Sequence, residues 1–472
     1  MLFTSLEFAI FFPIVFCLYW LLKKYHKAQL SLILLSSYVF YGWWDWRFLS
    51  LIIFSSVADF TLGILLGKEE DPKLRKLLVG ISLLVNLGLL GVFKYFDFFA
   101  ESFVAAFSWF GQDISYSTLN IVLPVGISFY TFQTLSYTLD VYRGKLKPTK
   151  NILAFFSFVS FFPQLVAGPI ERASHLLGQF YSPRKFDYAW AVSGVRLFIW
   201  GFFKKMVIAD NAASLVNPIF ENYSEQNSIV LILGAILFAF QIYGDFSGYS
   251  DMAIGLSRIL GFDLMLNFRF PYLAKSINDF WKRWHISLSS WFRDYLYIPI
   301  GGSYGSNLFS FRNVMIVFLV SGFWHGANWT FIVWGLIHGL MYVPLFLKKS
   351  QNKSRETEST FGLAMSTIFT FLVVCLAWVF FRSESVSEAF SYLSGVFTNS
   401  GSANIILASN KRLLTLCVVL FAAVVMMMVE FNYERKGKNE VLLPSYGLGI
   451  VVLGIMFFGA FSNPEDFIYF QF

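Results

Sequence analysis

The chain has 472 residues, of which 57% are hydrophobic and only 14% are charged, and its formal net charge is +7. Soluble proteins of this length usually carry about a quarter charged residues, so the composition excludes a soluble globular protein and predicts an integral membrane protein. We attribute the basic excess to membrane topology and expect no nucleic-acid partner.

Long apolar runs predict transmembrane helices along the whole chain. Each run reaches or approaches the roughly 20 residues that a helix needs to cross a bilayer. The predicted spans, about eleven, lie near residues 6–22, 29–44, 48–67, 77–97, 152–168, 188–209, 228–243, 313–346, 362–381, 413–430 and 445–461. Strands of a membrane barrel would alternate in polarity over about ten residues, whereas these runs are continuously apolar. The sequence therefore predicts an all-α, polytopic integral membrane bundle that forms one domain over residues 1–472.

Basic residues at the ends of these runs predict the topology. The first run is followed by three lysines between residues 23 and 27, so we expect a retained first helix whose C-terminal end faces the cytoplasm. Further basic clusters, expected on the same side, lie at 68–76, 143–150, 348–355 and 435–438.

Polar, ionisable, glycine and proline residues interrupt the apolar sequence most often between about 121 and 340. Polar groups at membrane depth are costly and tend to face a cavity or the bundle interior, so this region is the predicted functional core. Its first stretch, 123–133, contains Pro124 and Gly126 and ends at Gln133. We expect a re-entrant or tilted segment there.

Two carboxylates, Asp245 and Asp251, follow the apolar span at 228–243. They are expected either at the membrane interface or along a cavity, and the sequence leaves both possibilities open.

A cluster of aromatic and charged residues follows at 279–295. Asp279 and Arg283 are four residues apart, the spacing of a helical ion pair. Aromatic rings beside cations are typical of a helix in the headgroup region, so an interfacial helix is one interpretation. Anchoring explains every residue of this cluster except His285.

His325 lies inside the apolar run 313–346, between Trp324 and Gly326. That run is longer than one crossing and contains Gly322, Gly326 and a polar residue, which predicts a break or a re-entrant turn. An ionisable residue at membrane depth is a functional candidate, and a histidine suits a general base because its ordinary pKa is about 6.5. The two glycines would leave room for a substrate atom. A satisfied core histidine is the alternative.

His338 follows thirteen residues after His325, which corresponds to about 220° around a straight helix. The two side chains would then face nearly opposite ways. Unless the helix is broken between them, we expect His338 to serve packing. Asn328, one helical turn after His325, is expected either to orient its ring, to donate to a developing oxyanion, or to pack.

These motifs resemble those of the membrane-bound O-acyltransferases, and within that family the bacterial alginate O-acetyltransferase-like branch. The most specific stretches are 279–289, 293–299 and 324–331, with Trp334-Gly335 and His338-Gly339 after them, and the resemblance covers essentially the whole chain. It implies a catalytic His325, a second polar partner at His285, and a central tunnel among transmembrane and re-entrant or interfacial helices. The residues expected to line or support the tunnel are Asn328, Trp324, Trp284, Asp245 and Gln133.

The resemblance also implies the substrates. An acyl group, most plausibly acetyl, would pass from a cytoplasmic thioester donor, acetyl coenzyme A or an acylated carrier, toward hydroxyls of an extracytoplasmic polysaccharide or cell-wall glycan. A secreted or membrane-anchored hydrolase-like protein would accept it, and the chain would lie in the bacterial inner membrane. We expect no permanently bound cofactor and no metal, since the cysteines lack metal-type spacing. D-alanyl transfer to teichoic acids and a transporter or flippase are the alternatives, and both a direct and an acyl-histidine route stay open.

Overall fold

The computed structural model describes residues 1–108, 123–344, 359–400, 405, 409–461, 465 and 467–470. Within these residues the regular secondary structure is helical throughout and contains no strand, which confirms the all-α prediction. The basic cluster predicted at 348–355 lies outside the described residues. The described chain forms two compact units, one of residues 1–195 and 253–265 and the other of residues 196–252 and 266–472. A single domain over the whole chain therefore stays a prediction.

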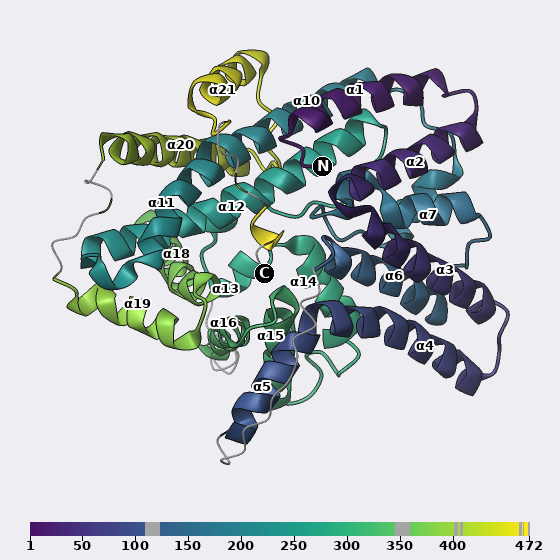
Figure 1. Ribbon diagram of the computed structural model, residues 1–472, viewed down its shortest axis with the longest axis horizontal. Helices are drawn as coiled ribbons and strands as arrows, with labels where there is room; N and C mark the ends of the chain where they lie inside the picture. The colour runs from purple at the N-terminus through teal and green to yellow at the C-terminus, as the bar shows by residue number, and fades with distance from the viewer. Residues whose placement is uncertain are drawn as a thin grey trace. The chain divides into compact units, whose positions relative to one another are not determined.

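The first unit is a set of packed helices in the N-terminal part of the chain. Its helices are α1 (Leu6–Leu21), α2 (His26–Asp45), α3 (Leu49–Leu66), α4 (Pro72–Leu90), α5 (Phe96–Ser108), α6 (Ile127–Tyr142), α7 (Ile152–Ser160), α8 (Phe162–Leu165), α9 (Ala173–Leu176) and the start of α10 (Tyr188–Phe203). Helices α3, α4 and α6 pack against one another, and α7 packs against α2 and α3 (Figure 1).

A buried polar network joins three helices of this unit. Asp59 on α3 accepts hydrogen bonds from Ser82 and Asn86 on α4 and from Thr138 on α6, at 2.5, 2.7 and 2.8 Å. A carboxylate buried in apolar surroundings is tolerated when donors satisfy it, so this network explains how the helices accommodate Asp59. Because its oxygens are occupied in this way, we assign it to helix packing.

The second unit contains the rest of the helices. They are α11 (Asp210–Glu221), most of α12 (Ser228–Ile259), α13 (Ile277–Trp281), α14 (Ile286–Phe292), α15 (Asn307–His325), α16 (Trp329–Leu340), α18 (Thr360–Arg382), α19 (Val386–Thr398), α20 (Asn410–Arg435) and α21 (Ser445–Phe458). The short π-helical segments η4 (Lys204–Ala209) and η7 (Arg293–Tyr297) and the 3₁₀ helix η8 (Ile468–Phe470) also belong to it.

Six helical stretches of the described residues are long and apolar enough to cross a bilayer, and three shorter apolar helices accompany them. The six are 26–66, 72–108, 228–259, 307–325, 360–382 and 410–435. A stretch of 41 residues such as 26–66 exceeds one crossing, so a multi-pass membrane protein is confirmed, whereas the number eleven stays a prediction.

One segment differs from the sequence-based expectation, and the structure adds detail to a second. The run at 152–168 is not one span, because α7 ends at Ser160 and the chain is non-helical at Phe161, with Pro163 next in the short α8. The stretch around Gln133 is an ordinary buried helix, α6, which starts after Gly126 in the left-handed region at φ 76°. Pro124 and Gly126 precede this helix. A re-entrant or tilted position of the segment in the membrane stays a prediction.

The expected break in the long apolar run is confirmed, since α15 ends at His325 and α16 begins at Trp329. The two helices pack closely along small residues: a Cβ on Gly322 would collide with the Phe331 carbonyl, and one on Gly326 would collide with the Phe331 ring. The expectation that these glycines leave room for a substrate atom is therefore wrong. They make room for the neighbouring helix.

Candidate active site

His325 lies at the C-terminal end of α15, where it is almost fully buried among aromatic rings. Its imidazole lies 5.1 Å from the Trp334 ring and 5.3 Å from the Phe381 ring, both in edge-on geometry, measured between ring centroids. The ring of Tyr469 lies 5.7 Å away. Helices α15, α16 and α18 and the C-terminal turn η8 thus converge on one imidazole.

His285 is the residue before α14 and has a left-handed backbone, with φ at 44°. This conformation is energetically unfavourable for a residue with a Cβ, and such backbone strain is often found at functional sites. The side chain of His285 is fully buried, and its Nδ1 lies 2.9 Å from Oδ1 of Asn267. The next amide, Ile286 N–H, donates to the Asn267 carbonyl at 2.8 Å.

The two histidines belong to one aromatic cluster. The Trp324 ring lies 5.0 Å from His325 and 6.0 Å from His285. On another side, the Phe246 ring of α12 lies 4.6 Å from both His285 and Tyr469. The structure thus brings together residues that are 40 positions apart in the sequence, buried among aromatic rings.

His285 lies in the turn between α13 and α14, outside the helices long enough to cross the membrane. Its burial lowers its pKa to about 3. The cause is desolvation of the charged form, so the imidazole is neutral near pH 7. A neutral imidazole can accept a proton or a hydrogen bond, which is what a site for hydroxyl activation needs.

Buried charges lie next to this cluster on the π-helical segment η4. Lys205 Nζ forms ion pairs with Asp210 at 2.8 Å and with Asp245 at 2.9 Å, and it donates to the Glu465 carbonyl at 2.9 Å. The other carboxylate oxygen of Asp245 accepts the Ile468 N–H at 2.6 Å. The ion pairs therefore hold the backbone of the C-terminal turn, whose Tyr469 ring packs against His325.

Asp245 and Asp251 both form ion pairs with lysines of η4. Their two expected locations, the membrane interface or a cavity, stay predictions. Asp245 is 3% exposed and binds Lys205, and Asp251 pairs with Lys204 at 2.7 Å. Buried carboxylates of this kind need such partners.

The remaining predicted supporting residues have different surroundings. Trp284, which precedes His285 in the chain, is buried, and its ring centroid lies 5.0 Å from that of Trp378. Asn328 caps α16, because its Oδ1 accepts the Thr330 N–H at 3.0 Å while its Nδ2 donates to the Glu384 carbonyl. These contacts correct the expectation that Asn328 lies on the His325 helix.

Gln133 lies in the first unit, in α6. Its amide donates to the Phe158 carbonyl at 2.6 Å. A role for Gln133 in a tunnel stays a prediction.

His338 lies on α16 and accepts a hydrogen bond from Trp281 Nε1 at its Nδ1, at 3.3 Å. The helix is broken after His325, so the straight-helix angle between the two histidines does not apply. The ring of Trp334 lies 4.7 Å from His338 and 5.1 Å from His325. The acceptor role toward Trp281 is consistent with packing, and that assignment stays a prediction.

The ion pair between Asp279 and Arg283 is confirmed, at 2.8 Å, and Glu434 on α20 adds a second carboxylate at 2.6 Å from Arg283. The aromatic residues of the same stretch, however, are buried: Phe280 and Trp284 are each 1% exposed. An interfacial anchor helix is therefore the wrong interpretation. The stretch is part of the interior that carries His285.

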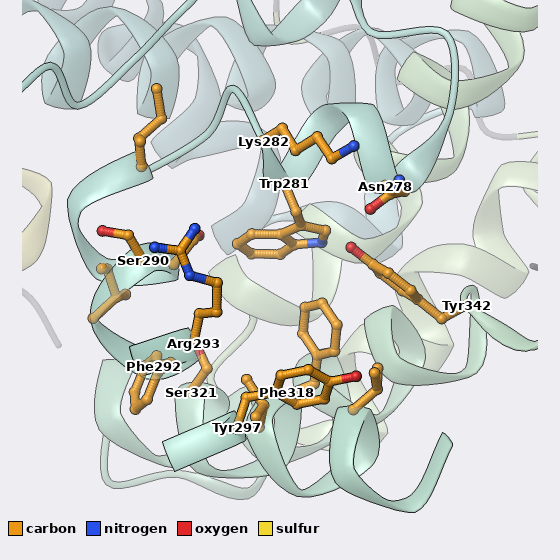
Figure 2. A pocket seen from close by; sticks show the side chains of 15 residues that line it. Asn278, Trp281, Lys282, Ser290, Phe292, Arg293, Tyr297, Phe318, Ser321 and Tyr342 are labelled. Carbon is orange, nitrogen blue, oxygen red and sulfur yellow. The ribbon is translucent and has the colours of Figure 1, made fainter. Parts of the chain in front are cut away.

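A cavity of about 450 Å³ opens beside this stretch. Figure 2 shows Trp281 in the middle of its lining, with the cationic side chains of Lys282 and Arg293 on two sides. Ser321 also lines it and lies one helical turn before His325 on α15. A molecule held in this cavity would thus lie close to the histidine cluster. It would meet the Lys282 ammonium and the Arg293 guanidinium, which also pairs with Asp294 at 2.8 Å.

Sequence reasoning missed Asn267, Tyr469 and the Lys204–Lys205 pair. The lysines carried a usable signal, since two adjacent cations inside the apolar run 188–209 are costly at membrane depth and are usually functional or paired. Asn267 and Tyr469 lie in unremarkable sequence, and only the folded chain brings them to the histidines.

The fold and this cluster define a multi-pass helical membrane protein that buries two histidines among aromatic rings, an arrangement suited to proton transfer. The profile of the membrane-bound O-acyltransferase family matches residues 148–387. The chain is 39% identical over 402 residues to the probable alginate O-acetylase AlgI of Azotobacter vinelandii, covering 84% of this chain and 78% of that protein. It is 36% identical over 428 residues to the peptidoglycan O-acetyltransferase of Helicobacter pylori, covering 84% and 80%.

A more distant similarity, 29% over 279 residues, links the chain to the teichoic acid D-alanyltransferase of Bacillus subtilis, covering 56% of this chain and 70% of that protein. The chain belongs to the membrane-bound O-acyltransferase family. It is an O-acyltransferase, which sets the transporter alternative aside.

Proposed function

We propose that this protein transfers acetyl groups from a cytoplasmic thioester donor to hydroxyl groups of an extracytoplasmic polysaccharide or cell-wall glycan. The observation that carries the proposal is the burial of His285 and His325 in one aromatic cluster. Relatives named as alginate and peptidoglycan O-acetylating enzymes support acetyl as the group transferred. The proposed location is the bacterial inner membrane, and the proposed acceptor partner is a secreted or membrane-anchored hydrolase-like protein.

The chemistry needs one proton to move. An acceptor hydroxyl attacks the thioester carbonyl, its oxygen forms the new ester bond, and the thiolate leaves with the proton that a base removed from the hydroxyl. His325 is the proposed base, because its ring lies at the meeting point of α15, α16 and the C-terminal turn. The same ring could instead carry the acyl group between two transfers, which would add an acyl-imidazole intermediate.

The cavity lined by Trp281, Lys282 and Arg293 is the proposed entrance for the thioester donor. Acetyl coenzyme A carries phosphate groups, as does the phosphopantetheine arm of an acylated carrier, and cations bind both. Ser289 and Ser290 supply hydroxyls in the same lining. The thioester donor is consumed as a substrate. The proposal includes no permanently bound cofactor.

Lys282→Glu is expected to raise the KM for acetyl coenzyme A about tenfold and to leave kcat within about twofold. The charge reversal repels donor phosphates at an exposed position of the cavity, which affects binding and not the reacting atoms. Steady-state kinetics on the purified protein measure both constants. Lys275→Glu, also at an exposed lysine of this region, is the control and should change neither. If Lys282→Glu and Lys275→Glu have the same KM for acetyl coenzyme A, the donor does not enter at Lys282.

The proposed function is tested in cells. A strain without the gene is complemented with the wild type, and ester-linked acetate and ester-linked D-alanine are released from the isolated cell-wall and surface polysaccharide by mild base and quantified. Restored acetate supports the proposal. Restored D-alanine with unchanged acetate would instead support the second candidate, D-alanyl transfer, which rests on the weaker similarity to teichoic acid D-alanyltransferases.

A further inference from the structure

Asn267 is fully buried, and its side chain joins the segment that carries His285 to helix α12. Its Oδ1 lies 2.9 Å from His285 Nδ1 and accepts the Ser287 hydroxyl at 2.9 Å, while its Nδ2 donates to Ser250 Oγ at 3.0 Å. The Asn267 carbonyl also accepts the Ile286 N–H at 2.8 Å. One residue therefore fixes both the backbone and the ring of the strained turn at His285.

Two backbone hydrogen bonds join the segment around Asn267 to the turn at His285. The Arg269 N–H donates to the Arg283 carbonyl at 2.9 Å. The Phe268 ring packs edge-on against Trp284 at 5.0 Å. These contacts hold the Asn267 backbone in place, so that its side-chain amide lies against the His285 imidazole.

The amide geometry determines which ring nitrogen of His285 carries the proton. A carbonyl oxygen can only accept a hydrogen bond, so with the Asn267 amide in this orientation the nitrogen that faces Oδ1 must be N–H. In a neutral imidazole the other nitrogen is then the acceptor. Nε2 of His285 therefore presents a lone pair, and the ring contacts Phe246 and Trp324, which belong to the aromatic cluster of His325.

We infer that Asn267 is a positioning residue that holds His285 as the Nδ1–H tautomer, so that His285 serves the acyl-transfer site as a hydrogen-bond acceptor. This inference rests on the proposed function only in its last clause. A ring whose Nε2 is an acceptor cannot donate a hydrogen bond from that atom to a developing oxyanion. His285 would therefore accept a hydrogen bond from a hydroxyl or an amide N–H of a substrate.

The His285 imidazole contacts four uncharged side chains. They are the rings of Phe246 on α12, Phe268 in the preceding segment and Trp324 on α15, with the amide of Asn267. A carboxylate introduced at position 267 would thus be a new charge directly at Nδ1. It would favour the imidazolium and raise the pKa of His285.

The direct test reads the tautomer without any assay of activity. The chain has five histidines, so protein labelled with ¹³C and ¹⁵N in histidine gives a ring spectrum that can be assigned by difference with a His285→Gln sample. The expected result is the Nδ1–H tautomer at His285 near pH 7. The Nε2–H tautomer, or imidazolium, in the wild-type protein would overturn the inference even if acetyl transfer is demonstrated.

Two variants separate positioning from packing. Asn267→Asp keeps an acceptor for His285 and Ser287 and can accept from the Ser250 hydroxyl, so it should fold, and it should move the acidic limb of the pH–kcat/KM profile upward by about one pH unit or more. Asn267→Leu has a similar volume but no acceptor, and should lower kcat about tenfold. An unshifted profile in Asn267→Asp together with full kcat in Asn267→Leu would refute the positioning role. If the wild type fails to transfer acetyl groups, the proposed function fails while the tautomer result stands.

Discussion

His325→Gln is expected to lower acyl transfer by about 10² to 10⁴-fold, the usual contribution of a general base. Glutamine approximates the size of the imidazole and keeps polar atoms within the aromatic cluster, but it cannot take a proton from a hydroxyl near neutrality. The loss should appear in kcat, with the donor KM nearly unchanged, because the substitution leaves the proposed donor entrance at Lys282 intact. Purified variants, matched for the amount of monodisperse protein, are compared in an assay that contains acetyl coenzyme A, the hydrolase-like partner protein and a soluble glycan acceptor.

His338→Gln is the matched control. His338 is fully buried on the next helix and accepts a hydrogen bond from Trp281, and a glutamine oxygen can take over that role. We expect its kcat within about threefold of the wild type. Full activity in His325→Gln would refute His325 as the base, and equal losses in both variants would show that the effect comes from packing around Trp334 and not from proton transfer.

The parts of the structure that depend on local sequence could be predicted. The continuous apolar runs predicted helices, the polar interruption after His325 predicted the break between α15 and α16, and the spacing of Asp279 and Arg283 predicted their ion pair. Each of these features is decided within a few residues of the chain, so no knowledge of the fold is needed.

The parts that depend on packing between distant segments could not be predicted. From the sequence alone, Gly322 and Gly326 suggest space for a substrate. In the structure, Phe331 of the neighbouring helix occupies the space beside both glycines. In the same way, Phe280 and Trp284 look like membrane-interface anchors but lie in the interior. Aromatic side chains suit both places, so composition cannot distinguish them.

The candidate site shows the same division. The resemblance of the motifs supplied His285 and His325, and the structure places them in one cluster. Tyr469 follows His325 by 144 positions, and its neighbourhood depends on ion pairs between η4 and α12. A sequence pattern with a period of a few residues carries no information about such a contact.

Those ion pairs lead to the second large expected effect. Asp245→Asn should lower kcat by roughly 100-fold, because one oxygen of Asp245 faces the Lys205 ammonium and the other faces the Ile468 N–H. An asparagine amide has one oxygen and one NH₂ group, so in either orientation it sets a donor against a donor. Losing a hydrogen bond to a charged group and leaving a buried donor unsatisfied costs about 2 to 3 kcal/mol, which is enough to release the C-terminal turn from its place beside His325.

The control for Asp245→Asn is Asp251→Asn on the same helix. Asp251 faces the Lys204 ammonium at 2.7 Å, and an asparagine there can turn its oxygen toward the lysine, which Ser247 also binds at 2.8 Å. We expect a loss in kcat of less than about fivefold. Limited proteolysis of the purified variants should show faster cleavage near Tyr469 in Asp245→Asn alone. If Asp245→Asn keeps full kcat and resists cleavage, the turn is held by its aromatic contacts with Phe246 and not by the buried charges.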